Sequence, residues 1–549
     1  HPLSRRQRQM CIRDSILTVS TLFFVSIISI ISYDRVNSFD ISRSLKLMSV
    51  DFSSNQINTM VDYVNRNREG YNQMREFKLE ENIKPSISFN LPYNQNFNYD
   101  YQFQTIKTEL PEYDYQIAFL SIQELAYLIK NKILSSERLT RIYIDRIKKF
   151  DTKLNSVVNL MEDVAIEQSL RADNEIERGI YRGILHGIPY GIKDIASYPS
   201  YPTTWGTEPY KNRIINEKAE VIKKLENAGA VMIAKLSSGS LAKGDIWYNG
   251  KTKNPWDINQ GSSGSSAGSA SATSAGLVSF SIGTETLGSI ISPSTRCGVT
   301  GLRPTYGTVS TNGFMTLSWS MDKVGPITIS DSDAAIVFNV IKYKGSSKQR
   351  PLEFNSIKNL KIGYLKNLFE KDTSMYAVNN SKIIEILKNK YKLDSVSLPK
   401  DYPFKVFDII LRSEAGAFFD KFLMDNLDSE MILQDEKSRA NSIRQSRLIP
   451  AVEYIQASRF RTKLISEVDS LFKNYDVILS PSFGKNQLLI TNLTGHPAIS
   501  IPNGFDKNNR PTSISLLSNY YEEHKLISLA NEIQKLTDFH KKIPPGFKE

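Results

Sequence analysis

A serine- and glycine-rich segment, GSSGSSAGSASATSAG at residues 261–276, gathers hydroxyl groups that could supply a nucleophile. Such a composition is typical of flexible linkers, which connect domains through polar sequence. Here the apolar run LVSFSIGTET follows without a break, and a second Gly/Ser segment, LGSIISPS, comes after it. Two such segments on either side of an apolar run indicate backbones that approach something closely. We therefore interpret this region as a loop whose hydroxyls do chemistry.

One hydrolase pattern, G-x-S-x-G, is centred on Ser266. In α/β-hydrolases this motif needs a preceding strand and a histidine late in the chain. The preceding residues NPWDINQG make a poor strand. The late histidines lie in an apolar strand-like run or on a charged helix, and they are His496, His524 and His540. The pattern is therefore a weak match.

The scarcity of histidine, with five in the chain, directs attention to lysine as a base. Lys193 stands in GIPYGIKDIAS, an apolar strand bounded by glycines, where a charged side chain is unfavourable unless it has a task. Burial lowers the pKa of a lysine toward neutrality, so such a residue can activate a serine. The alternative is structural, with Lys193 paired to the neighbouring Asp194.

The elements around these residues alternate between strands and helices. Residues 121–150 have a helical pattern, and Ser121 and Glu124 have the spacing of a capping box. Strands are predicted in GIPYGIKDIA, AVMIAKL, GLVSFSIGTET, YDVILSPS and HPAISIPNGF, and helices in AEVIKKLENAG and HKLISLANEIQKLTDF. This alternation favours a mostly parallel sheet covered by helices. Residues 351–471 are more helical and charged, which is typical of an insertion or a cap over the sheet.

Together, HGIPYGIKD, NPWD, the run from the Gly/Ser loop to GLRPTYGTVS, MDKVGPI and TGHPAISIP resemble the amidase signature family of serine hydrolases. The resemblance extends over residues 117–542, and within the family it points to the exported, envelope-associated bacterial branch. It implies an α/β fold with a central mixed β-sheet flanked by helices. The catalytic domain would be single and large, at residues 116–545.

The resemblance also implies roles for four side chains. Lys193 matches the base, Ser265 the bridging serine that follows a cis peptide bond, and Ser289 the nucleophile, 24 residues after Ser265. Neutral Lys193 would take a proton from Ser265 while Ser265 takes one from Ser289, which attacks the amide carbonyl. Ser266 matches a supporting hydroxyl. No metal or cofactor is implied.

The same resemblance implies that backbone N–H groups meet the developing oxyanion. They belong to Thr286, Leu287, Gly288 and Ser289. The chain departs from the common family pattern here, because GTETLGS places Glu285 and Leu287 where Asp and Gly are usual. Ala267 and Ile291 replace a frequent Gly and a frequent Arg. These departures bear on substrate choice more than on catalysis, since all three triad residues are present.

The overall charge does not indicate a nucleic-acid partner. The formal net charge is +11, but Lys and Arg are scattered among Asp and Glu without a basic run. The two cysteines are Cys11 and Cys297, so the sequence predicts neither a disulfide framework nor a cysteine-rich metal site. Cys297 has no neighbouring histidine and is predicted to be a small buried packing residue.

The N-terminal residues have the character of targeting and processing segments. Residues 1–15 carry four arginines, lack an initiator Met and resemble translated sequencing-adapter sequence, so we interpret them as a non-native leader. Residues 16–33 are uncharged and near the length that spans a bilayer, which predicts a signal peptide or a membrane anchor, with a buried core helix as the alternative. The protein would then be exported and be periplasmic, secreted or membrane-anchored. Residues 34–115 form a predicted polar N-terminal arm with a helix over 53–77.

These features predict an amidase that hydrolyses a linear carboxamide C–N bond in a small-molecule or peptide substrate, giving a carboxylate and ammonia or an amine. One alternative is the glutaminase (A) subunit of a tRNA-dependent amidotransferase. An export segment argues against it, because that enzyme works in the cytoplasm with a partner chain. A second alternative is a catalytically silent binding protein with the same fold, against which the intact triad argues.

Overall fold

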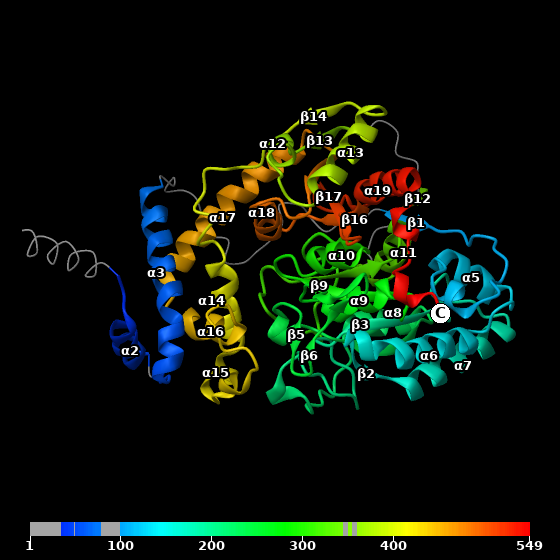
Figure 1. Ribbon diagram of the computed structural model, residues 1–549, viewed down its shortest axis with the longest axis horizontal. Coiled ribbons are helices and arrows are strands. Elements are labelled where there is room, and N and C mark those ends of the chain that lie inside the picture. The colour runs from blue at the N-terminus through cyan, green and yellow to red at the C-terminus, as the bar shows by residue number, and fades with distance from the viewer. Residues whose placement is uncertain (1–34, 49, 78–98, 344–349, 354–359) are drawn as a thin grey trace, which may run out of the picture.

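The computed structural model describes residues 35–48, 50–77, 99–343, 350–353 and 360–549 (Figure 1). The predicted leader at 1–15 and the predicted signal or anchor segment at 16–33 lie outside the described residues. Within the ranges given above, no helix is both long and apolar enough to cross a membrane.

A mixed sheet of eleven strands forms the centre of the protein, in the order β14-β13-β15-β17-β16-β10-β11-β9-β3-β4-β2. Parallel pairing in this sheet is confined to β3 with β4 and β9, and to β13 with β14 and β15. The central mixed sheet is therefore confirmed, whereas the mostly parallel pairing favoured by the strand and helix alternation holds only locally. The strands are β2 (Val157–Leu160), β3 (Pro189–Lys193), β4 (Val231–Leu236), β9 (Phe280–Glu285), β10 (Thr300–Arg303), β11 (Lys323–Thr328), β13 (Ile362–Tyr364), β14 (Leu393–Ser395), β15 (Val477–Pro481), β16 (Ala498–Phe505) and β17 (Pro511–Ser518).

Every residue of β3, β4 and β9 is buried, which indicates that helices cover both faces of the sheet. Helices in contact with its strands include α6 (Ser136–Leu154), α7 (Glu162–Glu177), α8 (Glu220–Asn227), α9 (Ala267–Ser274), α10 (Ile291–Cys297), α11 (Asp331–Ile341), α13 (Ala377–Lys388) and α19 (Glu523–Thr537). Shorter elements include α4 (Asp114–Ala118), β5 (Ile246–Trp247), β6 (Gly250–Lys251), β7 (Lys253–Asn254), β8 (Asp257–Gly261), α12 (Lys366–Glu370) and α18 (Gln487–Thr494).

The single helix predicted over residues 121–150 is two helices. α5 (Ile122–Lys130) begins at the predicted capping box, in which Ser121 and Glu124 cap each other's backbone N–H groups. The chain then turns through Lys132, whose φ of 58° lies in the left-handed region, and α6 begins after a new N-cap at Ser135. The apolar pattern continues across the break because Leu134 in the turn is itself buried.

Four helices form what we call the cap: α14 (Ile409–Phe418), α15 (Asp420–Met424), α16 (Arg439–Ser446) and α17 (Ala451–Phe472), drawn in yellow to orange beside the sheet in Figure 1. Glu414 of α14 joins the cap to the loop that precedes β11, because its carboxylate accepts hydrogen bonds from the hydroxyls of Ser318 and Ser320, both at 2.7 Å. The interpretation of residues 351–471 as an insertion is only partly right, since β13 and β14 from this stretch extend the central sheet.

The N-terminal arm contains α2 (Ser38–Leu47) and α3 (Ser54–Glu76), and α3 confirms the helix predicted over 53–77. α3 lies along the cap in Figure 1. The amide of Asn67 on α3 donates to Gln445 of α16 at 3.3 Å, and Arg412 of α14 donates to both residues, at 2.9 and 2.7 Å. Beyond α3, β1 (Tyr99–Gln102) pairs in parallel with β12 (Arg350–Glu353).

The packing of α3 against Val406, in the segment that leads into the cap, depends on Gly70. A Cβ added there would lie 2.5 Å from Cβ of Val406, which is too close for any side chain. We expect Gly70→Val to lower the free energy of unfolding by about 1–3 kcal/mol, measured by urea unfolding, because the added branch overpacks this contact. Glu69→Val, one position away and exposed, should change it by no more than about 0.5 kcal/mol. Equal effects of the two substitutions would contradict the packing.

Candidate active site

Lys193 ends β3 with its side chain fully buried. Its Nζ lies 2.8 Å from Oγ of Ser265 and 2.9 Å from Oγ1 of Thr284. Thr284 belongs to β9, the parallel neighbour of β3, so the strand pairing brings its hydroxyl to the amine. Sequence reasoning did not single out Thr284, although its place beside the predicted oxyanion segment could have marked it.

The structural alternative, in which Lys193 pairs with Asp194, is wrong. Successive residues at the end of a strand point to opposite sides. Asp194 instead forms an ion pair with Lys235 of β4, with Nζ and Oδ1 2.6 Å apart, and it also accepts the hydroxyl of Thr204. The acid next to Lys193 in sequence is therefore occupied elsewhere.

Burial lowers the pKa of Lys193 from its ordinary value near 10.5 to about 7. The carboxylates of Asp322 and Glu285 oppose this shift, and the positive charge of Arg439 adds to it. A large share of the amine is consequently neutral near pH 7, which is the state that a general base requires.

The Gly/Ser segment is a buried loop followed by a helix, so it is not a linker. The Gly264–Ser265 peptide bond is cis, as the family resemblance implies. Ser265 and Ser266 are both buried, and α9 begins at the next residue, Ala267. The hydroxyl of Ser266 donates to the carbonyl of Thr284 and accepts that residue's N–H, both at 3.1 Å. Ser266 thus fixes the loop to the end of β9.

Ser289 follows β9 and has a partly exposed side chain. Its carbonyl accepts the N–H of Ser266 at 3.2 Å, which joins the two serine-bearing loops through their main chains. Among the described residues, no hydrogen bond connects the hydroxyls of Ser265 and Ser289. The structure therefore brings Lys193 and Ser265 into direct contact and places Ser289 on the adjoining loop.

The predicted oxyanion segment, residues 286–289, is a turn in which Gly288 has a φ of 88°. Within the part of the chain that the structure describes, none of its four N–H groups donates a hydrogen bond to another residue. The side chain of Leu287 is 37% exposed and therefore points outward. Like any residue other than proline, Leu287 still offers its N–H group. These donors are available to a developing negative charge.

Glu285, which replaces the usual Asp of the family pattern, anchors this turn. Its Oε2 accepts the N–H groups of Ile290 and Ile291 at 2.9 Å each, and its Oε1 accepts donors from Arg303 and Asn492 at 2.8 Å each. Burial alone would raise the pKa of Glu285, but the Arg303 guanidinium and these hydrogen bonds hold it below its usual value. The longer side chain thus reaches beyond the turn and holds it from the α10 side.

A second anchor for the turn is Asp322, which sequence reasoning also missed. The hydroxyl of Thr286 donates to its Oδ1 at 2.6 Å, and the N–H groups of Leu317 and Ser318 donate to its Oδ2 at 2.7 and 3.0 Å. Asp322 lies in MDKVGPI, one of the segments that resemble the amidase signature family, and this position could have marked it as a residue of the site.

The nucleophile-elbow interpretation of Ser266 is wrong. In the described chain no histidine hydrogen-bonds to Ser266, and His496 is buried between the rings of Phe472 and Tyr520 with its Nδ1 2.7 Å from Oγ1 of Thr494. Cys297 is fully buried, and burial raises the pKa of its thiol well above the ordinary value. Its predicted role as a packing residue is confirmed.

Comparison with known proteins agrees with this geometry. The sequence model of the family described as Amidase matches residues 138–491, and the chain belongs to that family. It is similar to the A subunits of the glutamyl-tRNA(Gln) amidotransferases of Prochlorococcus marinus and Acinetobacter baumannii, each 31% identical over 77% of this chain and over 99% and 97% of the relative. Its fold is similar to that of the peptide amidase of Stenotrophomonas maltophilia, with a TM-score of 0.69, 23% identity and coverage of 79% of this chain and all of that one. The protein is thus an amidase-signature enzyme that acts on amide C–N bonds.

The Glu285–Arg303 ion pair has both side chains completely buried. We expect Arg303→Met to lower the free energy of unfolding by about 3–5 kcal/mol, because it leaves a buried carboxylate without its cation. The matched control is Arg510→Met, which removes a pair with Asp257 that is partly exposed and should cost about 1 kcal/mol or less. Urea unfolding of the two variants measures the difference, and similar losses would contradict the role of the buried pair.

Proposed function

We propose that the protein hydrolyses a linear carboxamide of a small molecule or peptide to a carboxylate and ammonia or an amine, through an acyl-enzyme on Ser289. Ser265 and Lys193 form the proton relay. The observation that carries this proposal is the 2.8 Å contact between the buried Lys193 amine, whose pKa is about 7, and the hydroxyl of Ser265.

In this mechanism the lone pair of neutral Lys193 accepts the proton of Ser265, and Ser265 takes the proton of Ser289. The Ser289 oxygen can then attack the carbonyl carbon of the amide. Catalytic hydrogen bonds often tighten only when substrate is bound, which accounts for the missing contact between the two serine hydroxyls. The oxyanion is stabilised by the N–H groups of residues 286–289.

Collapse of the tetrahedral intermediate breaks the C–N bond. The proton held by Lys193 returns through Ser265 to the leaving nitrogen, which departs as ammonia or an amine. Water then attacks the acyl-serine by the same relay and releases the carboxylate. Every proton lost by a nucleophile is thus returned to a leaving group.

Ammonia release from a panel of aliphatic, aryl, amino-acid and C-terminally amidated peptide amides tests the reaction. We expect Ser289→Ala, Ser265→Ala and Lys193→Met each to lower kcat by on the order of 10⁴-fold or more, because the relay acts as a unit. Ser292→Ala serves as the control, since Ser292 is a partly exposed serine on α10, and it should retain activity. A Ser289→Ala variant as active as the wild type would exclude this nucleophile.

The pKa of Lys193 sets the expected pH dependence. The base must be neutral, so kcat/KM should rise with pH through about 7 and fall roughly tenfold per unit below it. Initial rates between pH 5 and 9 on the best amide of the panel measure this limb. A rate independent of pH across that range would contradict a lysine base.

A second candidate function is that of the A chain of an amidotransferase, and the identity to such chains over almost their whole length favours it. Glutamine distinguishes the two candidates. Under our proposal the chain acts alone on amides of the panel. Hydrolysis confined to glutamine, and only with a partner chain added, would support the second candidate. A folded wild-type protein that releases no ammonia and leaves Ser289 unlabelled by a fluorophosphonate would support a silent binding protein.

A further inference from the structure

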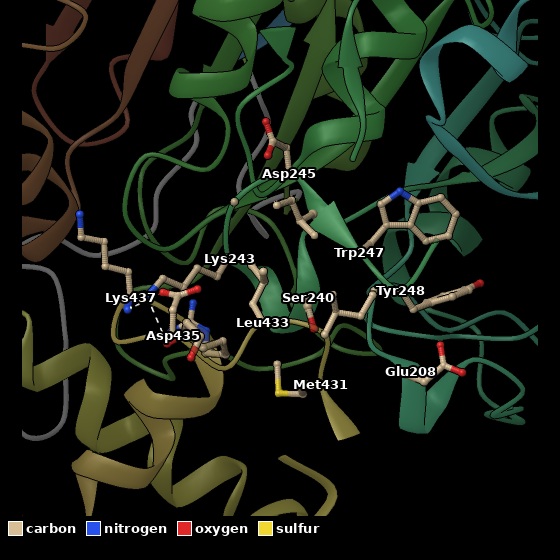
Figure 2. Close-up of a pocket in the computed structure, with 16 residues that line it drawn as sticks. Glu208, Ser240, Lys243, Asp245, Trp247, Tyr248, Met431, Leu433, Asp435 and Lys437 are labelled. Carbon is tan, nitrogen blue, oxygen red and sulfur yellow. Dashed lines mark hydrogen bonds between the residues drawn. The ribbon is translucent and has the colours of Figure 1, made fainter. Parts of the chain in front are cut away.

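Arg439, the first residue of α16, reaches from the cap to a loop of the catalytic side. Its Nε donates to the carbonyl of Leu241 at 3.0 Å, and its Nη2 donates to the carbonyl of Ala242 at 3.1 Å. The side chain is only 8% exposed. It lines a cavity of about 200 Å³ between the cap and this loop, and the other lining residues include Ser240, Lys243, Asp435 and Lys437 (Figure 2).

The 239–244 loop, whose carbonyls accept hydrogen bonds from Arg439, has an energetically unfavourable backbone conformation. Leu241 and Ala242 have φ values of 45° and 59°, in the left-handed region where a Cβ is crowded. Two consecutive carbonyls in this conformation are held by one planar guanidinium, whose fork of N–H groups fits such a pair. The clamp is therefore an external support for a conformation that the loop does not favour by itself.

The clamped loop supports the serine relay directly. The N–H of Gly239 donates to the carbonyl of Ser265 at 3.3 Å. The carbonyl oxygen of Gly244, at the other end of the loop, lies where a Cβ on Gly264 would fall, only 1.9 Å from that position. The loop thus contacts both residues of the cis peptide, so its position sets that of the Ser265 hydroxyl.

Arg439 also contributes charge. The charged groups that face Lys193 are Asp322, Glu285 and Arg439, and Arg439 is the cation among them. Arg439 itself faces Asp322 and, from α3, Tyr63, and its charge acts on Lys243 across the cavity. A positive charge here disfavours protonation of the base.

The helix that carries Arg439 is held by the N-terminal arm. Asn441 of α16 donates to the carbonyl of Thr59 on α3 at 2.8 Å, in addition to the contact between Asn67 and Gln445 described above. The arm lies outside residues 138–491, the part matched by the family. This support for α16 therefore comes from a segment that the family match does not include.

We propose that Arg439 is a positioning residue of the active site, which braces the 239–244 loop against Ser265 and places a positive charge on the Lys193 side of the cap, and that α3 holds it in place. The proposal rests on the proposed amidase function. It assigns the arm a part in catalysis without any contact to substrate.

The test is the rate at which a fluorophosphonate labels Ser289 in the full chain between pH 5 and 9, a readout that needs no substrate. Arg439→Lys keeps the charge but loses the fork. It should lower the labelling rate at high pH, which we call the plateau, about tenfold or more. The pH range over which the rate falls on the acid side, which we call the acid limb, should not move. Arg439→Met loses both. Its plateau should fall as far, and its acid limb should move to higher pH, because loss of the positive charge raises the pKa of Lys193.

Lys437→Met is the matched control, because it removes an exposed cation two residues away, and it should label like the wild type. Gly70→Val, which disturbs the seat of α3, should lower the plateau without moving the acid limb. Thermal unfolding identifies which variants are folded. If Arg439→Met is not folded, the positioning role is tested with Arg439→Lys alone.

Three results would overturn parts of the proposal. Folded Arg439 variants that label like the wild type would overturn the positioning role. A lower plateau with an unmoved acid limb in Arg439→Met would overturn the electrostatic part, and wild-type labelling by folded Gly70→Val would overturn the part assigned to the arm. A wild-type protein that neither labels nor releases ammonia would instead refute the proposed function itself, which separates the two failures.

Discussion

The amine of Lys193 is buried against two hydroxyls, and this burial lowers its pKa although Asp322 and Glu285 oppose the shift. The acids near it in the sequence and in the site are bound to other groups. Asp194 is paired with Lys235, Glu285 with Arg303, and Asp322 accepts Thr286 and two backbone amides. A carboxylate released from any of these partners would attract the lysine proton and raise its pKa. The partners of these carboxylates therefore help to keep the Lys193 amine neutral.

Glu285 and Asp322 also hold the backbone near Lys193. Glu285 accepts the N–H groups of Ile290 and Ile291, directly after the turn at residues 286–289, and Asp322 of the 317–322 loop accepts the hydroxyl of Thr286 within it. That loop is in turn fixed to the cap by Glu414. The hydrogen bonds that these carboxylates accept therefore both balance their charge and fix the loops around them.

Sequence was sufficient for the parts of the site that stand out locally. Lys193 interrupts an apolar strand, and the Gly/Ser loop continues straight into an apolar run, so both could be recognised from their neighbours. Contacts between distant segments could not be, since no local pattern records them. Glu285 meets Asn492 across 207 residues, and Arg439 meets Leu241 across 198. The break between α5 and α6 was missed for a different reason, because a buried leucine in the turn preserves the apolar periodicity.

The contacts of α3 with the cap join segments of the chain that are synthesised far apart in time. Arg66 of α3 pairs with Asp408, and Thr59 contacts Asn441, residues separated by 342 and 382 positions. At about 5–20 residues per second, the ribosome needs roughly 20–80 s to deliver the cap after the arm has emerged. During that interval α3 can pack on α2, but the side of α3 that contacts the cap has no native partner, and the 239–244 loop lacks its contact with Arg439. Ser265 and Ser289 are therefore synthesised well before Arg439, and strands β15 to β17 of the central sheet follow later still.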